Sequence, residues 1–307
     1  TMMFQATPPK HPPKEWQNVN KGFGHPRTNL HINYESGTNP RAASAIDSLT
    51  TMRPFDDAAM TQFTRNLKEK RNARLMIYTM PVHIATNQPE FLFFEREWML
   101  TPPTTWSGFT DGDGKGITLY PFCPATPARD LYAARTEKFF ADHPDLGGIY
   151  YDICHVTSCD NALHGCGGLD AFGKPFSRSI ALGLRNYLMR IYKLHRKYDA
   201  NLLNHAHNFF FPFVHDFGDS WIPGEQYIWE VGKNPKYFYF EGIPPEEYQC
   251  AYNPEIRGVG IYEIIQLCRA AEFVPELKSK RAEILSEEYG IHAIAPALLH
   301  NLGITPG

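Results

Sequence analysis

The stretch Gly147-Gly148-Ile149-Tyr150-Tyr151-Asp152 decides the fold prediction, because it reads as a short apolar strand that ends in a carboxylate. A long polar loop follows it, from His155 to Pro175. In a barrel of parallel strands the loops after the strands build the active site, and a carboxylate at the carboxyl end of a strand points into the mouth. An Asp that caps a helix or braces a loop explains the same position equally well.

The same pattern repeats outward from this stretch, beginning at about Arg27. Short apolar runs bounded by turn residues are typical of buried parallel strands. The predicted strands are Thr28 to Asn33, Arg74 to Met80, Ile117 to Phe122, Gly148 to Ile153, Asn201 to His205 and Gly258 to Tyr262. Two more strands can be placed within Asp216 to Trp229 and His292 to Leu299.

Helices are predicted between the strands. Asp56 can cap a helix that runs to about Arg71. A second helix spans Ser177 to Tyr198 with a continuous apolar stripe, and a third spans Pro275 to Tyr289 and ends at Gly290.

Strands that alternate with helices predict an α/β fold with a parallel sheet. Eight strands would close it into a (β/α)8 TIM-like barrel with long strand-to-helix loops. A doubly wound open sheet is the alternative, and the absence of a GxGxxG motif after the first strand weakens it. Residues 1–26 read as an extended N-terminal arm, and residues 27–307 as the barrel domain.

The composition excludes some partners. A formal net charge of −3 gives no electrostatic basis for binding nucleic acid or an anionic membrane. No apolar run approaches the roughly 20 residues that span a bilayer. Aromatic residues make up 14% of the chain, and such rings either fill a core or stack on sugars. Trp98 ends the very aromatic stretch Phe91 to Trp98 inside a long loop, which makes it a candidate for sugar stacking.

A second polar segment runs from His215 to Glu225 and contains Asp216, Asp219 and Trp221. Glycosidases need two carboxyl groups that flank the scissile bond. Asp152 with Asp216, Asp219 or Glu225 can supply them. An ordinary polar loop is the other interpretation.

His205 and His207 lie on the same side of a strand, because side chains alternate. They can line a polar pocket, or they can ligate a metal together with Asp152. No third ligand follows at a standard spacing, so the hydrogen-bonding role is favoured, and we expect neither a metal nor a cofactor.

The six cysteines allow disulfides, and Cys159 lies close to Cys166 in a loop rich in Gly, Asn and Asp. A zinc site is the other use of such residues, but the CxxC spacing is absent, which argues against it.

Several of these segments resemble bacterial proteins related to glycoside hydrolase family 123. The resemblance rests on Tyr150 to Asp152, on Cys159 to Gly167, on His205 to Glu225 and on Ala297 to His300. It implies a secreted or periplasmic barrel enzyme that cleaves an oligosaccharide or polysaccharide, and with it a Cys159–Cys166 disulfide.

One departure from that family bears on the mechanism. Its characterised enzymes use an adjacent Asp-Glu pair, whereas Asp152 is followed by Ile153. Glu225 is therefore the predicted catalytic partner of Asp152, with Asp219 as its substitute. Tyr151, His205, His207, Trp221 and Trp98 are the predicted sugar-binding residues. A non-catalytic carbohydrate-binding barrel and a metal-dependent hydrolase are the rival interpretations.

Overall fold

The computed structural model describes residues 10–13, 19–20, 30–33, 52, 56–110, 114–206 and 210–306. The chain divides into two compact units. We call Asn18–Leu203 the amino-terminal unit, and Asn204–Gly307 together with Thr1–Gln17 the carboxyl-terminal unit. The division into an arm of residues 1–26 and one barrel domain of residues 27–307 stays a prediction.

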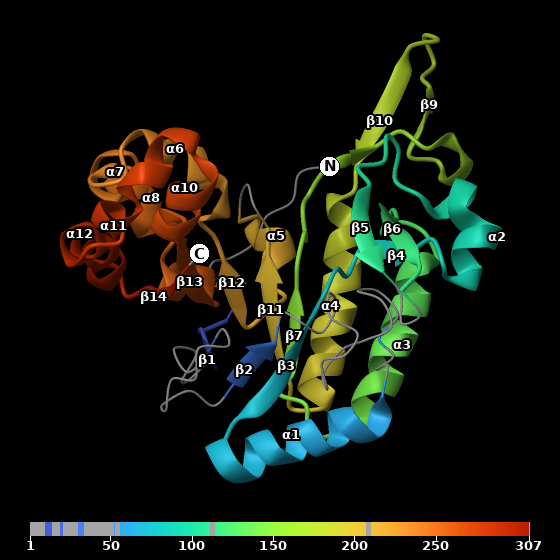
Figure 1. The fold of residues 1–307 in the computed structure, drawn as a ribbon. Helices are drawn as coiled ribbons and strands as arrows, with labels where there is room; N and C mark the ends of the chain where they lie inside the picture. The colour runs from blue at the N-terminus through green and yellow to red at the C-terminus, as the bar shows by residue number, and fades with distance from the viewer. Residues whose placement is uncertain are drawn as a thin grey trace. The chain divides into compact units, whose positions relative to one another are not determined.

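Parallel strands form the centre of the amino-terminal unit (Figure 1). Their order is β1 (Val19–Asn20), β2 (Leu30–Asn33), β3 (Arg74–Thr79), β7 (Gly148–Tyr151) and β11 (Asn201–His205). Three long helices belong to this unit: α1 (Asp57–Arg71), α3 (Ala128–Asp142) and α4 (Ala181–Lys197). Helices α3 and α4 lie side by side in Figure 1. The predicted strands at β2, β3, β7 and β11 are confirmed, with small shifts of their ends.

Local sequence explains two of these helices. The Asp56 side chain accepts a hydrogen bond from the backbone N–H of Ala59 at 2.9 Å, which confirms the predicted cap of α1. Helix α4 buries Leu184, Leu188 and Ile191 from its apolar stripe. It begins four residues later than predicted, because Pro175–Ser179 form a strand instead.

The long loop after β3 builds a small antiparallel sheet, in the order β4 (His83–Ala85), β6 (Gly116–Pro121) and β5 (Trp106–Thr110). The prediction of a buried parallel strand at Ile117 to Phe122 is therefore wrong. Residues of β6 alternate between buried and more exposed positions, which is typical of an antiparallel strand with one covered face. The aromatic stretch before it forms α2 (Pro89–Trp98).

The loop after β7 also has structure of its own. It contains β8 (Ser158–Cys159), the short 3-10 helix η3 (Ala162–His164), β9 (Gly167–Leu169) and β10 (Pro175–Ser179). Strand β10 pairs antiparallel with both β8 and β9.

The carboxyl-terminal unit contains three more parallel strands: β12 (Ser220–Ile222), β13 (Gly260–Ile265) and β14 (Gly303–Pro306). Every residue of β13 is buried. The rest of the described unit consists mainly of short helices, of which α12 contacts β13 and β14. They are α5 (Pro212–His215), η4 (Glu225–Tyr227), α6 (Ile228–Lys233), α7 (Phe238–Glu241), α8 (Pro245–Cys250), α9 (Pro254–Arg257), α10 (Leu267–Phe273), η5 (Pro275–Lys280), α11 (Arg281–Ile284) and α12 (Glu287–Leu299). The strand predicted within Asp216 to Trp229 is confirmed as β12.

Two other predictions for this unit are wrong. Residues His292 to Leu299 belong to α12, not to a strand, and the helix expected at Pro275 to Tyr289 is broken into η5 and α11, with α12 beginning at Glu287. Gly290 lies inside α12. A short apolar run does not distinguish a strand from a buried helix by its periodicity alone, which explains the first error.

The alternating plan of parallel strands and helices is thus present, but the described strands do not show a closed barrel. Among the described residues, no helix combines the length and the apolar character needed to cross a membrane.

Candidate functional site

Asp152 lies where the sequence predicts it, directly after β7 at the carboxyl end of the parallel strands. Its backbone N–H donates to the carbonyl of Thr79 at 2.8 Å, which extends the pairing with β3 by one residue. The Tyr78 hydroxyl donates to one carboxylate oxygen, and the Ile153 N–H donates to the other at 2.8 Å. The half-buried carboxylate is therefore held in one orientation at this strand end.

The residue after Asp152 has an unusual backbone. Ile153 has a φ of +56°, in the left-handed region that β-branched residues avoid. This conformation lowers stability by on the order of 1–3 kcal/mol, so it occurs only where the surrounding packing enforces it. Such residues cluster at functional sites. The Ile153 side chain is buried with Met80, Ile117 and Leu119, so the small sheet of β4, β5 and β6 supplies that packing.

His83 of β4 is a site residue that the sequence analysis missed. It is 2% exposed, and its Nδ1 has no hydrogen-bond partner among the described residues. Its pKa lies at about 4, mainly because burial lowers it; the nearby Asp152 carboxylate opposes this shift, and His155 adds to it. His83 is therefore a neutral imidazole close to Asp152 at neutral pH. In the sequence, its position as a histidine in the long loop after β3 could have indicated a role in the site.

Tyr151 is predicted to bind sugar beside Asp152, but the structure does not place it in the mouth. It is fully buried, and its hydroxyl is 3.2 Å from Nε2 of His195 in α4. Successive side chains of a strand point to opposite faces, so a residue next to Asp152 faces the helical layer. Tyr150, one residue earlier, packs edge-on against Tyr78 with ring centroids 5.2 Å apart.

The two predicted tryptophans are also buried. Trp98 is 6% exposed and stacks on Phe94 with ring centroids 4.4 Å apart. Trp221 is 2% exposed and packs against Phe210 and Tyr252 in the core of the carboxyl-terminal unit. Rings this deeply buried do not present an open face on which a sugar could stack.

Glu225 follows β12 at the carboxyl end of that strand and begins η4. Gly224 before it has a φ of +107°, and a Cβ there would lie 2.7 Å from the Ile264 carbonyl oxygen, so only glycine fits this turn against β13. The Arg269 guanidinium donates to one oxygen of Glu225, and the other lies 3.4 Å from Nε2 of His205. Glu225 is thus held between two basic side chains.

The other two acids of this segment are placed differently. Asp219 is 1% exposed and precedes β12, so it lies at the amino end of the strand, whereas Glu225 lies at the carboxyl end. Its carbonyl accepts from the N–H of Gly260 at 2.8 Å. Asp216 is 4% exposed and lies close enough to Arg257 to oppose the lowering of that residue's pKa by burial. Both positions favour structural roles and leave Glu225 as the candidate at the strand end.

Some predictions are not decided by the described residues. His207 lies outside them, so a ligand pair with His205 stays a prediction. Asp152 and Glu225 belong to different units, so their catalytic pairing also stays a prediction.

The predicted Cys159–Cys166 disulfide is not formed. All six cysteines are free thiols, and four of them are buried. Cys159 and Cys166 instead share a small buried cluster with Cys123 and the half-buried His164. The sequence pairing missed this because Cys123 comes from a different loop.

A scan against known protein families finds no match, and no curated protein sequence matches this chain. Solved structures resemble it at low identity. The noncanonic maltogenic alpha-amylase AmyB from Thermotoga neapolitana is 14% identical, with a TM-score of 0.50 over 93% of this chain and 59% of that chain. The maltogenic amylase from S.marinus is 12% identical, with a TM-score of 0.44 over 84% of this chain and 42% of that chain. Ega3 of Aspergillus fumigatus, in complex with galactosamine, is 10% identical, with a TM-score of 0.40 over 80% of this chain and 81% of that chain.

At a TM-score of 0.50, the likeness to AmyB shows a fold similar to that of this maltogenic alpha-amylase. The chain spans 34%, 59% and 56% of the length of the first three similar structures.

Proposed function

We propose that this chain carries the catalytic centre of a glycoside hydrolase, with Asp152 as a catalytic residue. The observation that carries the proposal is the placement of Asp152 at the carboxyl end of β7, oriented by Tyr78 and close to the buried, neutral His83. In barrel enzymes catalytic residues come from this end of the strands. The fold likeness to AmyB supports the same assignment at the level of architecture.

Glu225 is the proposed partner of Asp152. A glycosidase needs one carboxyl group that donates a proton and one that acts ionised, as a base or nucleophile. The Arg269 cation beside Glu225 favours its ionised form, which suits the second role. Asp152 is therefore assigned the role of proton donor.

The resemblance to glycoside hydrolase family 123 does not extend to the acid pair. The position after Asp152 holds Ile153, whose side chain is buried among Met80, Ile117 and Leu119. A carboxylate at that position would point into this apolar cluster, so the second acid has to come from another strand. We therefore propose an oligosaccharide or polysaccharide substrate whose cleavage does not need the acetamido group of an N-acetyl sugar. Secretion remains part of this proposal.

The deciding experiment is hydrolysis of a panel of chromogenic glycosides by the wild type and by Asp152→Asn. Removing a general acid lowers turnover typically by about 100-fold or more, while the nearly isosteric exchange leaves the fold intact. Asp142→Asn, an exposed aspartate at the end of α3, is the matched control and should retain full activity.

Two results would contradict the proposal. Full activity of Asp152→Asn would remove Asp152 from the chemistry. Saturable binding of oligosaccharides by a wild type that hydrolyses none of the panel would favour the non-catalytic carbohydrate-binding alternative.

A further inference from the structure

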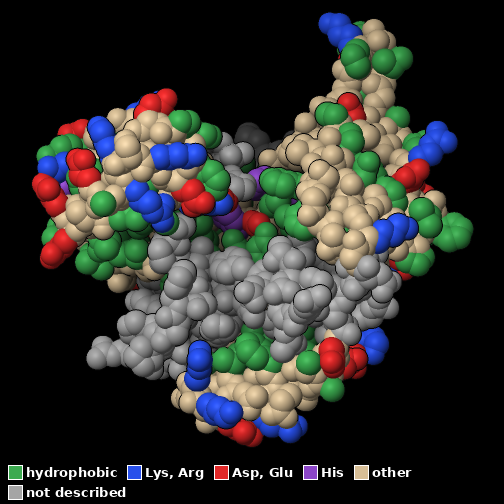
Figure 2. Space-filling view, in the orientation of Figure 1, with side chains coloured by type: hydrophobic (Ala, Val, Ile, Leu, Met, Phe, Trp, Pro, Cys, Tyr) green, Lys and Arg blue, Asp and Glu red, His purple; other side chains and the backbone are tan. Residues whose placement is uncertain are grey.

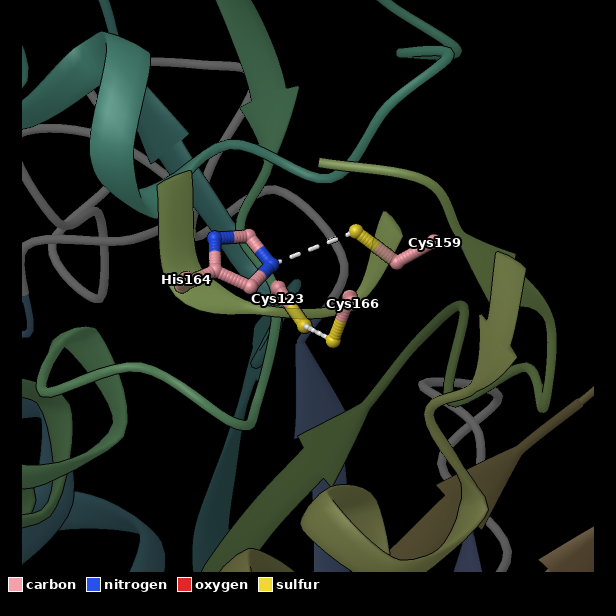
Figure 3. Close-up of side chains that lie close together, drawn as sticks. All are labelled: Cys123, Cys159, His164 and Cys166. Atoms are coloured by element: carbon pink, nitrogen blue, oxygen red, sulfur yellow. Dashed lines mark hydrogen bonds between the residues drawn. The ribbon is translucent and has the colours of Figure 1, made fainter. Parts of the chain in front are cut away.

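Four side chains of the amino-terminal unit surround a common point: Cys123, Cys159, His164 and Cys166 (Figure 3). Their three sulfur atoms and one ring nitrogen all lie within 4.8 Å of one another. The three thiols are buried and the imidazole is half-buried. We infer that this cluster is a structural zinc site with three cysteine ligands and one histidine ligand.

The separations of the ligand atoms fit a tetrahedral metal. Zinc–sulfur bonds of about 2.3 Å at tetrahedral angles place two sulfur atoms about 3.8 Å apart, and a sulfur and a nitrogen about 3.6 Å apart. Cys123 Sγ lies 3.8 Å from Cys166 Sγ, and Cys159 Sγ lies 3.3 Å from His164 Nε2. A disulfide needs sulfur atoms about 2.0 Å apart, so the cysteines are not placed as a bonded pair.

A hydrogen bond from one ring nitrogen of His164 orients the other ring nitrogen for metal binding. Its Nδ1 lies 2.5 Å from the backbone carbonyl oxygen of Glu97, to which it donates its proton. That tautomer leaves Nε2 with its lone pair facing the sulfur atoms. Metal-bound histidines almost always donate their other ring N–H to a carbonyl or a carboxylate in this way, which fixes the ring.

The backbone around the cluster is also fixed. The Cys123 N–H donates to the carbonyl of Trp98 at 2.8 Å, which ties the end of β6 to the end of α2. The Asn161 side chain donates to the carbonyls of Arg96 and Met99 at 2.9 Å each, and the backbone carbonyl of Asn161 accepts from the N–H of Cys166 at 3.0 Å. These bonds bring two loops that are far apart in sequence to one place.

The segment that carries the cluster has little apolar core to hold it. The core cluster there consists of the three thiols with Leu100 and Ile180. The neighbouring Leu163, Leu169 and Phe172 are 62%, 70% and 87% exposed. Figure 2 shows hydrophobic side chains beside Lys or Arg side chains at the tip of the β9–β10 hairpin. A metal cross-link would stabilise such a segment, as metals do in domains too small for a sufficient core.

The ligand set selects zinc among common metals. Three thiolates and one imidazole suit zinc, whereas magnesium and calcium prefer oxygen ligands. An iron–sulfur cluster needs its ligands spread around several metal and sulfide atoms, which this close spacing does not provide. Four protein ligands fill the tetrahedron and leave no open position for a substrate, so the site is structural. Binding Zn²⁺ converts three thiols to thiolates and releases their three protons to solvent.

Metal analysis of the untagged full-length chain tests this inference. We expect one zinc ion per chain, retained through gel filtration. Cys123→Ser, Cys166→Ser and His164→Gln should each lose most of that zinc. Cys250→Ser, which changes an exposed cysteine outside the cluster, is the matched control and should keep it.

A second measurement covers the case in which the variants do not fold. Wild-type protein stripped with a chelator and titrated with Co²⁺ should develop the visible absorption of a tetrahedral cobalt–thiolate centre, and added Zn²⁺ should abolish it. Wild-type protein that neither contains zinc nor gives this spectrum would overturn the inference. So would iron or copper as the bound metal, or a disulfide among the three cysteines detected by mass spectrometry of the unreduced protein.

Discussion

Glu263 provides a test of how the burial of an ionisable side chain affects the stability of this chain. It lies in the middle of β13, is fully buried, and neither of its carboxylate oxygens has a hydrogen-bond partner among the described residues. Burial, with a smaller contribution from Glu247, raises its pKa from 4.5 to about 8. The folded protein therefore keeps Glu263 protonated at neutral pH, whereas the unfolded chain ionises it.

The sign of the stability change follows from this difference. Above pH 4.5 the unfolded chain loses the proton that the folded protein retains, so the free energy of unfolding falls as the pH rises. The fall ends near pH 8, where the folded protein ionises as well. At about 1.4 kcal/mol per pH unit, the loss is on the order of 3 kcal/mol at pH 7 and about 4 kcal/mol at pH 8.

Glu263→Gln removes the titration while keeping the shape of the side chain. We expect the free energy of unfolding of the variant to depend less on pH between 5 and 8 than that of the wild type, by about 1 kcal/mol per unit. Urea denaturation at several pH values in this range, followed by tryptophan fluorescence, measures the slope. Glu272→Gln, an exposed residue of α10, is the control and should leave the slope unchanged. Equal slopes for Glu263→Gln and the wild type would refute the reasoning.

Further predictions concern the strand-end residues. Gly224→Ala should lower the free energy of unfolding by more than about 1 kcal/mol in thermal melts, because its φ is positive and β13 leaves no room, whereas Gly290→Ala in α12 has open space and should stabilise by about 0.5–1 kcal/mol. Tyr78→Phe removes the hydroxyl that orients the Asp152 carboxyl group and should lower kcat/KM by about 5-fold, because such a hydrogen bond contributes about 1 kcal/mol. Tyr151→Phe should reduce stability by about 1 kcal/mol but leave kcat/KM unchanged, because that hydroxyl faces the helical layer. Equal loss of activity in the two tyrosine variants would contradict the placement of both.

Much of the fold follows from local sequence patterns. The strand that ends before Asp152 and the helix after Asp56 have clear boundaries, because a buried run meets a polar loop in one case and a capping side chain in the other. The alternation of side chains along the strand also predicts where Tyr151 points. If Asp152 points into the mouth, its neighbour Tyr151 has to point away, and the structure places it so.

The remaining features depend on contacts between distant segments. Cys123 follows the end of β6, whereas its partners come from the loop after β7. No spacing motif in the sequence therefore indicates the cluster. His83 comes close to Asp152 because an unforeseen antiparallel sheet folds back over the end of β3. The run His292 to Leu299 reads equally as strand or helix, and only its packing, with Ala293 and Ala297 buried, selects the helix.

The cysteine cluster and the strand-end carboxylate are connected through β6. His83 lies opposite Pro121 in the β4–β6 pairing, and the Phe122 N–H donates to the carbonyl of Val82 at 2.9 Å. Cys123 is the next residue, so a metal bound to its sulfur would also fix the end of β6. Strand β6 pairs with β4, and this pairing holds His83 close to Asp152. Loss of the metal would then release this strand end and change the surroundings of Asp152 without removing any group that touches a substrate. A closed site with four protein ligands can influence turnover by this route, because positioning requires a rigid strand and no open coordination position.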